Sequence, residues 1–204
     1  MKITYLGGSD ISIIEKATSM PYQSKPSKEL VKKVWNMGHK SVARHSIVAF
    51  LAEDVSVSLL THISRHPHIN LTVKSSRYCN MENSDITIPP FIKKEDIEEY
   101  VKCVSMFKKY YIDWDNKENY TNKEKREITK MFLPKASTVD LVFSGNHQAM
   151  YEFLQLRLCS YHAEWEINEL AIMTRDILKK EFPEIYEDCR KDCKNCRDKR
   201  CLDA

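Results

Sequence analysis

Glycine is scarce in this chain, and its scarcity removes the commonest ways in which a protein binds a nucleotide. Only four glycines occur among 204 residues, and none belongs to a GxGxxG or GxxxxGK[ST] pattern. The phosphate loops of the Rossmann and P-loop folds need glycine where the backbone turns tightly against phosphate. If a nucleotide or a flavin binds here, we expect it to bind without either loop.

Length and composition indicate a soluble globular protein of one domain with at most a small appendage. The chain of 24.0 kDa is 42% hydrophobic and 30% charged, and its net charge of +3 is too small to indicate a nucleic-acid partner. No apolar run approaches the ~20 residues of a membrane span, and the first residues lack a signal-peptide pattern. Seven cysteines, without a secreted framework, fit a reducing compartment. We therefore expect a cytoplasmic protein with no membrane contact.

Apolar periodicity predicts a mixture of strands and helices. Alternating or β-branched stretches indicate strands, and apolar residues three or four apart indicate helices. Strands are expected at residues 2–6, 47–57, 86–90 and 138–143, and helices at 10–20, 27–37, 58–64, 95–111, 123–133, 148–158 and 163–182. Ser9 or Asp10 is expected to cap the first helix, Ser27 to open the second and Gly38 to end it, with a chain break at 144–146.

The stretch from residue 61 to residue 78 is unusually polar. It contains three histidines, two arginines, one lysine and two adjacent serines. Guanidinium, hydroxyl and backbone N–H groups at this density suit an anionic ligand, because together they hold phosphate oxygens. A solvated polar loop is the alternative that composition leaves open.

One arginine stands inside an apolar helix. Arg157 lies between Leu156 and Leu158 in a helix that is expected to be largely buried. A buried arginine must be paired with a carboxylate or with a ligand anion. Nearby carboxylates are available at Glu164, Glu166 and Glu169, so both interpretations stay open.

Metal binding has weak support. His39 and His45 lie in one turn with no third ligand nearby, and turn or capping duties explain them as well. The C-terminal residues 186–204 form a cysteine-rich tail with Cys189, Cys193, Cys196 and Cys201. Four thiolates at this spacing could hold zinc, and a disordered tail with uncommitted thiols is the alternative. We assign no metal-binding residue.

Four short motifs follow one another along the chain. They are Gly38-His39-Lys40-Ser41 with His45, Arg65-His66-Pro67 with Ser75-Ser76-Arg77 seven residues later, Phe153-Leu154-Gln155-Leu156-Arg157, and Ala163-Glu164-Trp165-Glu166-Ile167. Flavin-dependent thymidylate synthases have similar motifs in the same order, and their signature is Arg-His-Arg, seven residues, Ser, and then Arg two positions further on. On these motifs the chain resembles that family over most of residues 30–185.

The resemblance implies a fold and a reaction. The fold would be α+β, with a central antiparallel sheet and flanking helices over residues 1–185, assembled as a homotetramer. The reaction would convert dUMP to dTMP, with methylenetetrahydrofolate as carbon donor, FAD as redox carrier and NADPH as reductant. Small-molecule substrates and other copies of the chain would be its partners.

The resemblance also implies roles for individual residues. Arg157 would be catalytic, stabilising the ionised uracil ring. The dUMP site would comprise His62, Arg65, Lys74, Ser75, Ser76, Arg77, Lys130 and Arg157. The FAD site would comprise His39, Ser41, Arg65, His66, Asn146, His147, Gln148 and Glu152.

The chain departs from the family pattern at several of these positions. Its substitutions are Arg44 for glutamate, His62 for glutamine, Pro67 for arginine, Val73 for glutamate, Lys74 for tyrosine, Lys130 for arginine and Glu152 for asparagine, and one residue is inserted between Arg157 and Ala163. Two alternatives therefore stay open. One is a diverged flavin enzyme acting on another pyrimidine nucleotide or carbon donor, and the other is a nucleotide-binding relative without turnover.

Overall fold

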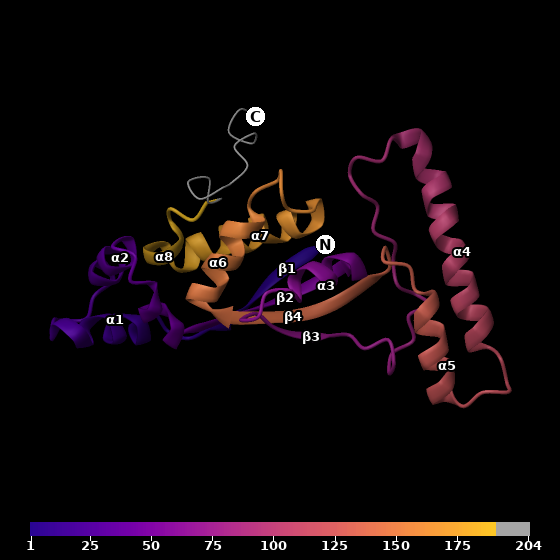
Figure 1. Ribbon diagram of the computed structural model, residues 1–204, viewed down its shortest axis with the longest axis horizontal. Coiled ribbons are helices and arrows are strands. Elements are labelled where there is room, and N and C mark those ends of the chain that lie inside the picture. The colour runs from indigo at the N-terminus through magenta and orange to yellow at the C-terminus, as the bar shows by residue number, and fades with distance from the viewer. Residues whose placement is uncertain (191–204) are drawn as a thin grey trace. The chain divides into compact units, whose positions relative to one another are not determined.

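The computed structural model describes residues 1–190 and contains helices and one four-stranded sheet (Figure 1). The strands are β1 (Lys2–Gly8), β2 (Ile47–Ser56), β3 (Asn70–Val73) and β4 (Thr138–Asn146), in the spatial order β1-β2-β4-β3. The backbone N–H of His147 donates to Ser46, and that of Val57 donates to Ser137. Residue numbers thus fall along β4 as they rise along β2, so the pair is antiparallel, as expected from the resemblance.

The chain divides into two compact units. Unit 1 comprises residues 1–2, 52–62 and 72–141, and unit 2 comprises residues 3–51, 63–71 and 142–204. Several elements contribute residues to both units, including β2, β4 and the helix α3 (Val57–Ile63). Each unit carries its own candidate functional residues, and the two sets are described separately below.

Alternation explains why β2 and β4 are central strands. Val48, Phe50 and Ala52 are fully buried in β2, whereas the residues between them are less covered. In β4 the buried residues again fall at every second position, and the ring of Phe143 stacks on that of Phe50 at a centroid distance of 5.2 Å. A period of two places one face of each strand against the core.

Two expectations about the strands are wrong. The break expected at 144–146 does not occur, because β4 continues to Asn146. Residues 86–90 do not form a strand, since only Ile86 makes an isolated bridge, to Ser137. Pro89 and Pro90 follow directly, and proline lacks the N–H that a strand ladder needs.

Strand β3 lies inside the polar stretch and was not expected. Its sequence is Asn-Leu-Thr-Val, with no residue buried on either face. β3 stands at the edge of the sheet beside β4, and the backbone N–H of Lys74 donates to Asp140 just beyond it. A short edge strand is specified by its partner more than by its own apolar pattern.

Within residues 1–190, unit 2 contains five α-helices. They are α1 (Ser12–Ser19), α2 (Lys28–Asn36), α6 (His147–Arg157), α7 (Trp165–Glu181) and α8 (Pro183–Tyr186). The Ser27 hydroxyl caps α2 by accepting from the N–H of Leu30, and Gly38, at a φ of +92°, follows its end. Helix α1 is preceded by Ile11 rather than by a polar cap, although the Asp10 carboxylate accepts from the N–H of Ser12. Most of the expected helices are thus present with shifted ends.

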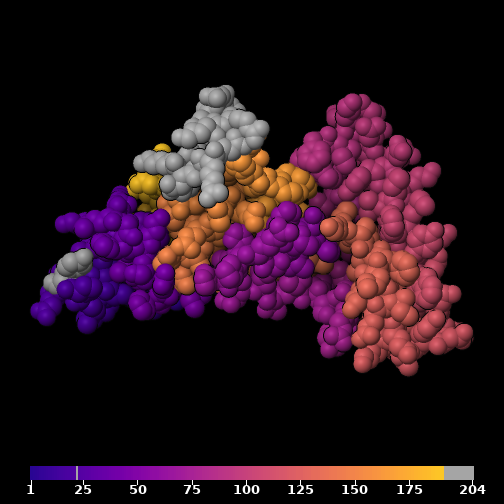
Figure 2. Space-filling model, viewed as in Figure 1, coloured from indigo at the N-terminus to yellow at the C-terminus, as the bar shows by residue number. Residues whose placement is uncertain are grey.

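Helices α4 (Ile97–Asp115) and α5 (Asn122–Thr129) pack against each other in unit 1 (Figure 2). A capping box formed by Thr121 and Glu124 starts α5. The helix expected at 123–133 is shorter, because its last turn is a 3-10 helix, Lys130–Phe132. Along α4 Val104 is buried, but Phe107 is 53% exposed, so the face expected to be apolar is covered only in part.

The start of the predicted tail packs into the core. Tyr186 and Cys189 are fully buried, although both lie in the stretch 186–204 that was expected to be separate. Cys193, Cys196 and Cys201 lie outside the described residues. Among the helices of residues 1–190, none is both long enough and apolar enough to span a membrane.

Candidate functional site

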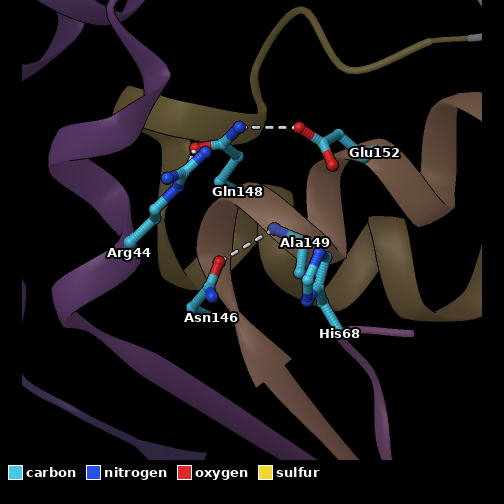
Figure 3. A pocket seen from close by; sticks show the side chains of 6 residues that line it. All are labelled: Arg44, His68, Asn146, Gln148, Ala149 and Glu152. Atoms are coloured by element: carbon cyan, nitrogen blue, oxygen red, sulfur yellow. Dashed lines mark hydrogen bonds between the residues drawn. The ribbon is translucent and has the colours of Figure 1, made fainter. Parts of the chain in front are cut away.

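A pocket of about 270 Å³ opens in unit 2 where β4 gives way to α6. Its lining combines one cation, one imidazole, two amides and one carboxylate with a single methyl group. The lining residues are Arg44, His68, Asn146, Gln148, Ala149 and Glu152 (Figure 3). Arg44 comes from the 3-10 helix Lys40–His45, and His68 lies two residues before β3. The pocket therefore joins the upstream turn, the polar stretch and the start of α6.

Three of these side chains form a hydrogen-bonded row. Arg44 Nε donates to Gln148 Oε1 at 2.8 Å, and Gln148 Nε2 donates to Glu152 Oε1 at 2.7 Å. Gln148 and Glu152 lie four residues apart on α6, a spacing that brings side chains to the same helix face. The row fixes the orientation of the Gln148 amide, since its oxygen faces a donor and its nitrogen faces an acceptor.

The last residue of β4 also starts α6. Asn146 Oδ1 accepts from the N–H of Ala149 at 2.9 Å, which caps the helix. No loop separates strand and helix, so the pocket residues of α6 are positioned by the sheet. The amide nitrogen of Asn146 is the part of its side chain left to face a ligand.

A side chain at Gly145 would be tightly confined at this junction. A Cβ atom built on Gly145 would lie 2.9 Å from Ile69 Cδ1 and 3.2 Å from the carbonyl oxygen of His68. The backbone before β3 thus packs directly on β4, and this contact places His68 at the pocket.

Arg157 and His66 form a second cluster in the same unit. Arg157 Nε donates to His66 Nε2 at 3.0 Å, and the His66 ring packs edge-on against Phe153. Because Nε2 accepts, the neutral ring carries its proton on Nδ1. Burial, and then the charge of Arg157, lower the pKa of His66 to about 4. Near neutral pH a neutral imidazole therefore holds a charged guanidinium in place.

The Arg157 guanidinium is half-buried at the C-terminal end of α6. Burial, and then the charge of Arg65, lower its pKa from the ordinary value. The end of the helix is fixed by Asn168, whose Nδ2 donates to the Arg157 carbonyl at 2.7 Å. A partly desolvated cation acts more strongly on a nearby developing negative charge than a solvated one does.

Five of the eight residues expected at the FAD site do not line the pocket beside α6: His39, Ser41, Arg65, His66 and His147. His147 is fully buried, its Nδ1 lies 3.0 Å from the Tyr186 hydroxyl, and burial lowers its pKa to about 4. Its imidazole therefore packs in the core, so any part of this residue in a cofactor site would fall to its backbone. His39 precedes the 3-10 helix and Ser41 lies within it, and both are exposed.

Unit 1 contains a larger pocket, of about 650 Å³, with three cationic side chains. It is lined by Arg77, Tyr78, Asn122, Lys123 and Arg126. Arg77 Nη2 lies 3.4 Å from Glu127 Oε1, and both side chains are about half exposed. Lys123 and Arg126 were not expected at a site, because a charged helix usually indicates only a solvated face.

Five further residues expected at the dUMP site belong to the same unit but do not line this pocket: His62, Lys74, Ser75, Ser76 and Lys130. In the turn that follows β3, the Ser75 hydroxyl accepts from the N–H of Arg77, and the Ser75 carbonyl accepts from the N–H groups of Tyr78 and Cys79. Lys74 lies 3.9 Å from Asp140, Lys130 begins the 3-10 helix after α5, and His62 lies on α3. Ser76 is half-buried within the turn.

Of the four cysteines of the predicted tail, Cys189 is the one that belongs to the described residues. It is buried, and burial raises the pKa of its thiol to about 12, so the thiol packs as a neutral group in the core. Within residues 1–190 no group of three or more His, Cys, Asp or Glu residues is placed to hold a metal ion.

These features define an α+β protein with two polar, cation-lined sites suited to anionic ligands. The model of the family described as thymidylate synthase complementing protein matches residues 3–184. A flavin-dependent thymidylate synthase from Clostridium tetani is 30% identical over 186 residues, which cover 83% of this chain and 74% of that protein. A probable flavin-dependent thymidylate synthase from Mycobacterium phage D29 is 29% identical over 167 residues, covering 76% and 69%.

A solved structure gives the same result. The flavin-dependent thymidylate synthase of Helicobacter pylori, complexed with FAD and dUMP, superposes with a TM-score of 0.76 at 25% identity, covering 94% of this chain and 100% of that one. The chain belongs to the thymidylate synthase complementing protein family. The family resemblance and the α+β fold expected from it are confirmed.

Proposed function

We propose that this protein is a flavin-dependent thymidylate synthase, which converts dUMP to dTMP with methylenetetrahydrofolate as carbon donor and NADPH as reductant. The family match over residues 3–184 carries the proposal. The Arg157–His66 pair at the end of α6 supports it. The names of the relatives from Clostridium tetani and Helicobacter pylori support the same reaction.

FAD is the proposed cofactor, and the pocket beside α6 fits part of it. Ligand pockets for drug-sized molecules are roughly 300–1,000 Å³. A volume of about 270 Å³ therefore suits one portion of FAD, with the rest lying outside this pocket. The lining supplies the groups that a nucleotide needs, because Arg44 is a cation for phosphate and Glu152 an acceptor for hydroxyl or amine donors. When bound, the flavin supplies the electrons of the reductive methylation.

Arg157 would act on the uracil ring of dUMP. Its fixed positive charge would stabilise negative charge that develops on the ring during methyl transfer, without giving up a proton. His66 would be a positioning residue, because its Nε2 accepts from Arg157 and sets the direction of the guanidinium.

The turn after β3 would bind the dUMP phosphate. The Ser75 and Ser76 hydroxyls, the Arg77 guanidinium and the Lys130 ammonium are all suited to phosphate oxygens. Arg77 lies 3.4 Å from Glu127 on the surface, so this contact is weak and a phosphate could replace it. Lys123 and Arg126 would add positive charge to the same pocket.

We further propose a cytoplasmic homotetramer whose active sites combine residues from several subunits. Such assembly would explain how a chain with a pocket of about 270 Å³ beside α6 could enclose a cofactor as large as FAD. Sedimentation of the purified protein measures the oligomeric state directly, and a monomer at micromolar concentration would contradict this part of the proposal.

A genetic and a biochemical experiment test the function. Expression of the full chain should allow a thymidine auxotroph to grow without thymidine, and the purified protein should be yellow and form dTMP from dUMP. A flavin-loaded protein that fails in both assays would indicate a diverged enzyme acting on another pyrimidine nucleotide or carbon donor. Purification without flavin, combined with binding of dUMP, would indicate a relative without turnover.

A further inference from the structure

The pocket beside α6 contains an arginine to which the sequence motifs assign no function. Arg44 uses only its Nε for the bond to Gln148, and its two terminal NH2 groups have no partner among residues 1–190. An arginine held at Nε presents its terminal N–H groups as a fixed fork, which is the geometry that binds phosphate oxygens. Arg44 is also an exposed side chain, so a ligand can reach it.

Gln148 separates Arg44 from the nearest carboxylate of the pocket. Glu152 accepts from Gln148 Nε2, and Gln148 Oε1 accepts from Arg44, so the carboxylate orients the arginine through a neutral amide. A direct Arg–Glu pair would occupy the fork and offset its charge. The amide instead fixes the guanidinium while its terminal N–H groups stay available.

Two departures from the family motifs line this pocket. Arg44 stands where the upstream turn of the family has glutamate, and Glu152 stands where the family has asparagine. Gln148 joins the two through its hydrogen bonds, so the new cation and the new carboxylate belong to one row.

We propose that Arg44 binds a phosphate group of the dinucleotide cofactor, and that Gln148 and Glu152 position it. This inference rests on the proposed function, because it assumes that FAD is the ligand. It adds Arg44 to the cofactor site and gives Glu152 an indirect role, as an acceptor that sets the orientation of Gln148.

The test compares ligands that differ only in phosphate. Release of FAD from the full-length holoprotein on dilution is followed by flavin fluorescence, and bound FAD is then displaced with ADP or with adenosine. The variants are Arg44→Gln, which removes the charge, and Arg44→Lys, which keeps the charge without the fork. Arg175→Gln is the matched control, because Arg175 lies on α7, outside the pocket, and pairs with its neighbour Asp176.

The expected result is a loss of phosphate recognition in one variant. Arg44→Gln should raise the dissociation constant of FAD about tenfold and abolish the preference for ADP over adenosine, with Arg44→Lys between it and wild type. Arg175→Gln should match wild type. If wild type and Arg44→Gln prefer ADP equally, the inference is wrong, although the proposed function stands. If the wild-type protein neither retains nor binds flavin, both this inference and the proposed function are wrong.

Discussion

Arg157 Nε donates to His66 Nε2 across 91 positions of sequence, at a distance of 3.0 Å. The acceptor is a neutral imidazole, because burial and the charge of Arg157 lower the pKa of His66 to about 4. One residue comes from the polar stretch and the other from the end of α6. The bond therefore joins two motifs that the sequence identifies separately, and it places a directed cation at the proposed substrate site.

Replacement of Arg157 tests whether catalysis depends on the orientation of its guanidinium as well as on its charge. Arg157→Lys keeps the positive charge but loses the Nε donor and the planar fork. We expect dTMP formation to fall by about 10²–10³-fold, the range found when one donor to a developing anion is removed. Flavin content, measured by absorbance, should stay near wild type. A lysine variant with nearly full activity would refute the proposed role, and Arg175→Lys on α7 serves as the control.

The buried His147 predicts a loss of stability in acid. Burial lowers its pKa from 6.5 to about 4, so between these values the unfolded chain binds a proton that the folded chain does not. Its contribution is fully present above about pH 6.5 and is lost as the pH falls to about 4. The loss in free energy of unfolding should be on the order of 3 kcal/mol. His66 acts in the same direction, with a smaller effect because it is half-exposed.

Urea midpoints measured across this pH range check the prediction. His147→Gln removes the titrating group, so its midpoint should change less with pH than that of wild type. The exposed His39 offers a matched control, and His39→Gln should follow the wild-type curve. Parallel curves for wild type and His147→Gln would show that another group causes the acid sensitivity.

Arg77 should recognise the phosphate of dUMP rather than its base or sugar. We expect Arg77→Gln to raise the dissociation constant of dUMP about tenfold, because charge-assisted hydrogen bonds to phosphate are lost. Binding of deoxyuridine, which lacks the phosphate, should be unchanged when both are measured by calorimetry. Lys109→Gln on the exposed side of α4 should bind like wild type. Equal weakening of dUMP and deoxyuridine would assign Arg77 to another part of the ligand.

Gly145→Ala tests the close approach of the polar stretch to β4. The added methyl would lie 2.9 Å from Ile69 Cδ1 and 3.2 Å from the carbonyl oxygen of His68. We expect a destabilisation of about 1–3 kcal/mol, typical of overpacking, and weaker FAD binding because His68 must shift. Ser144→Ala, one residue earlier in β4, should change neither quantity. Wild-type stability of Gly145→Ala would mean that the chain before β3 moves aside easily.

Cys189 should act as a core residue and not as a zinc ligand. Its thiol is buried, and burial raises its pKa to about 12, so it stays protonated near neutral pH. Cys189→Ser should lower the free energy of unfolding by about 1–3 kcal/mol, because a hydroxyl replaces an apolar group in the core. Zinc content of the full chain, measured by mass spectrometry, should not change. A stoichiometric loss of zinc in Cys189→Ser, absent from the exposed Cys103→Ser, would contradict this role.

Most helices and strands could be predicted from the sequence alone, because their signals are local. The period of two in β2, the serine before α2 and the glycine after it depend on neighbouring residues only. The order of the four motifs along the chain likewise indicated the family without any knowledge of the fold. Arg157, Ser75 and Arg77 could be proposed as site residues because they fall within these motifs.

Which side chains share a site could not be predicted from the sequence, because it depends on how distant elements pack. Arg44 and Gln148 lie 104 positions apart, and no local pattern indicates that they are bonded. His147 follows Asn146 in sequence, yet its ring turns into the core, because successive residues at the start of a helix point in different directions. β3 acquires its structure from pairing with β4. Periodicity reports what one element can bury, whereas a site depends on distances between elements that only packing fixes.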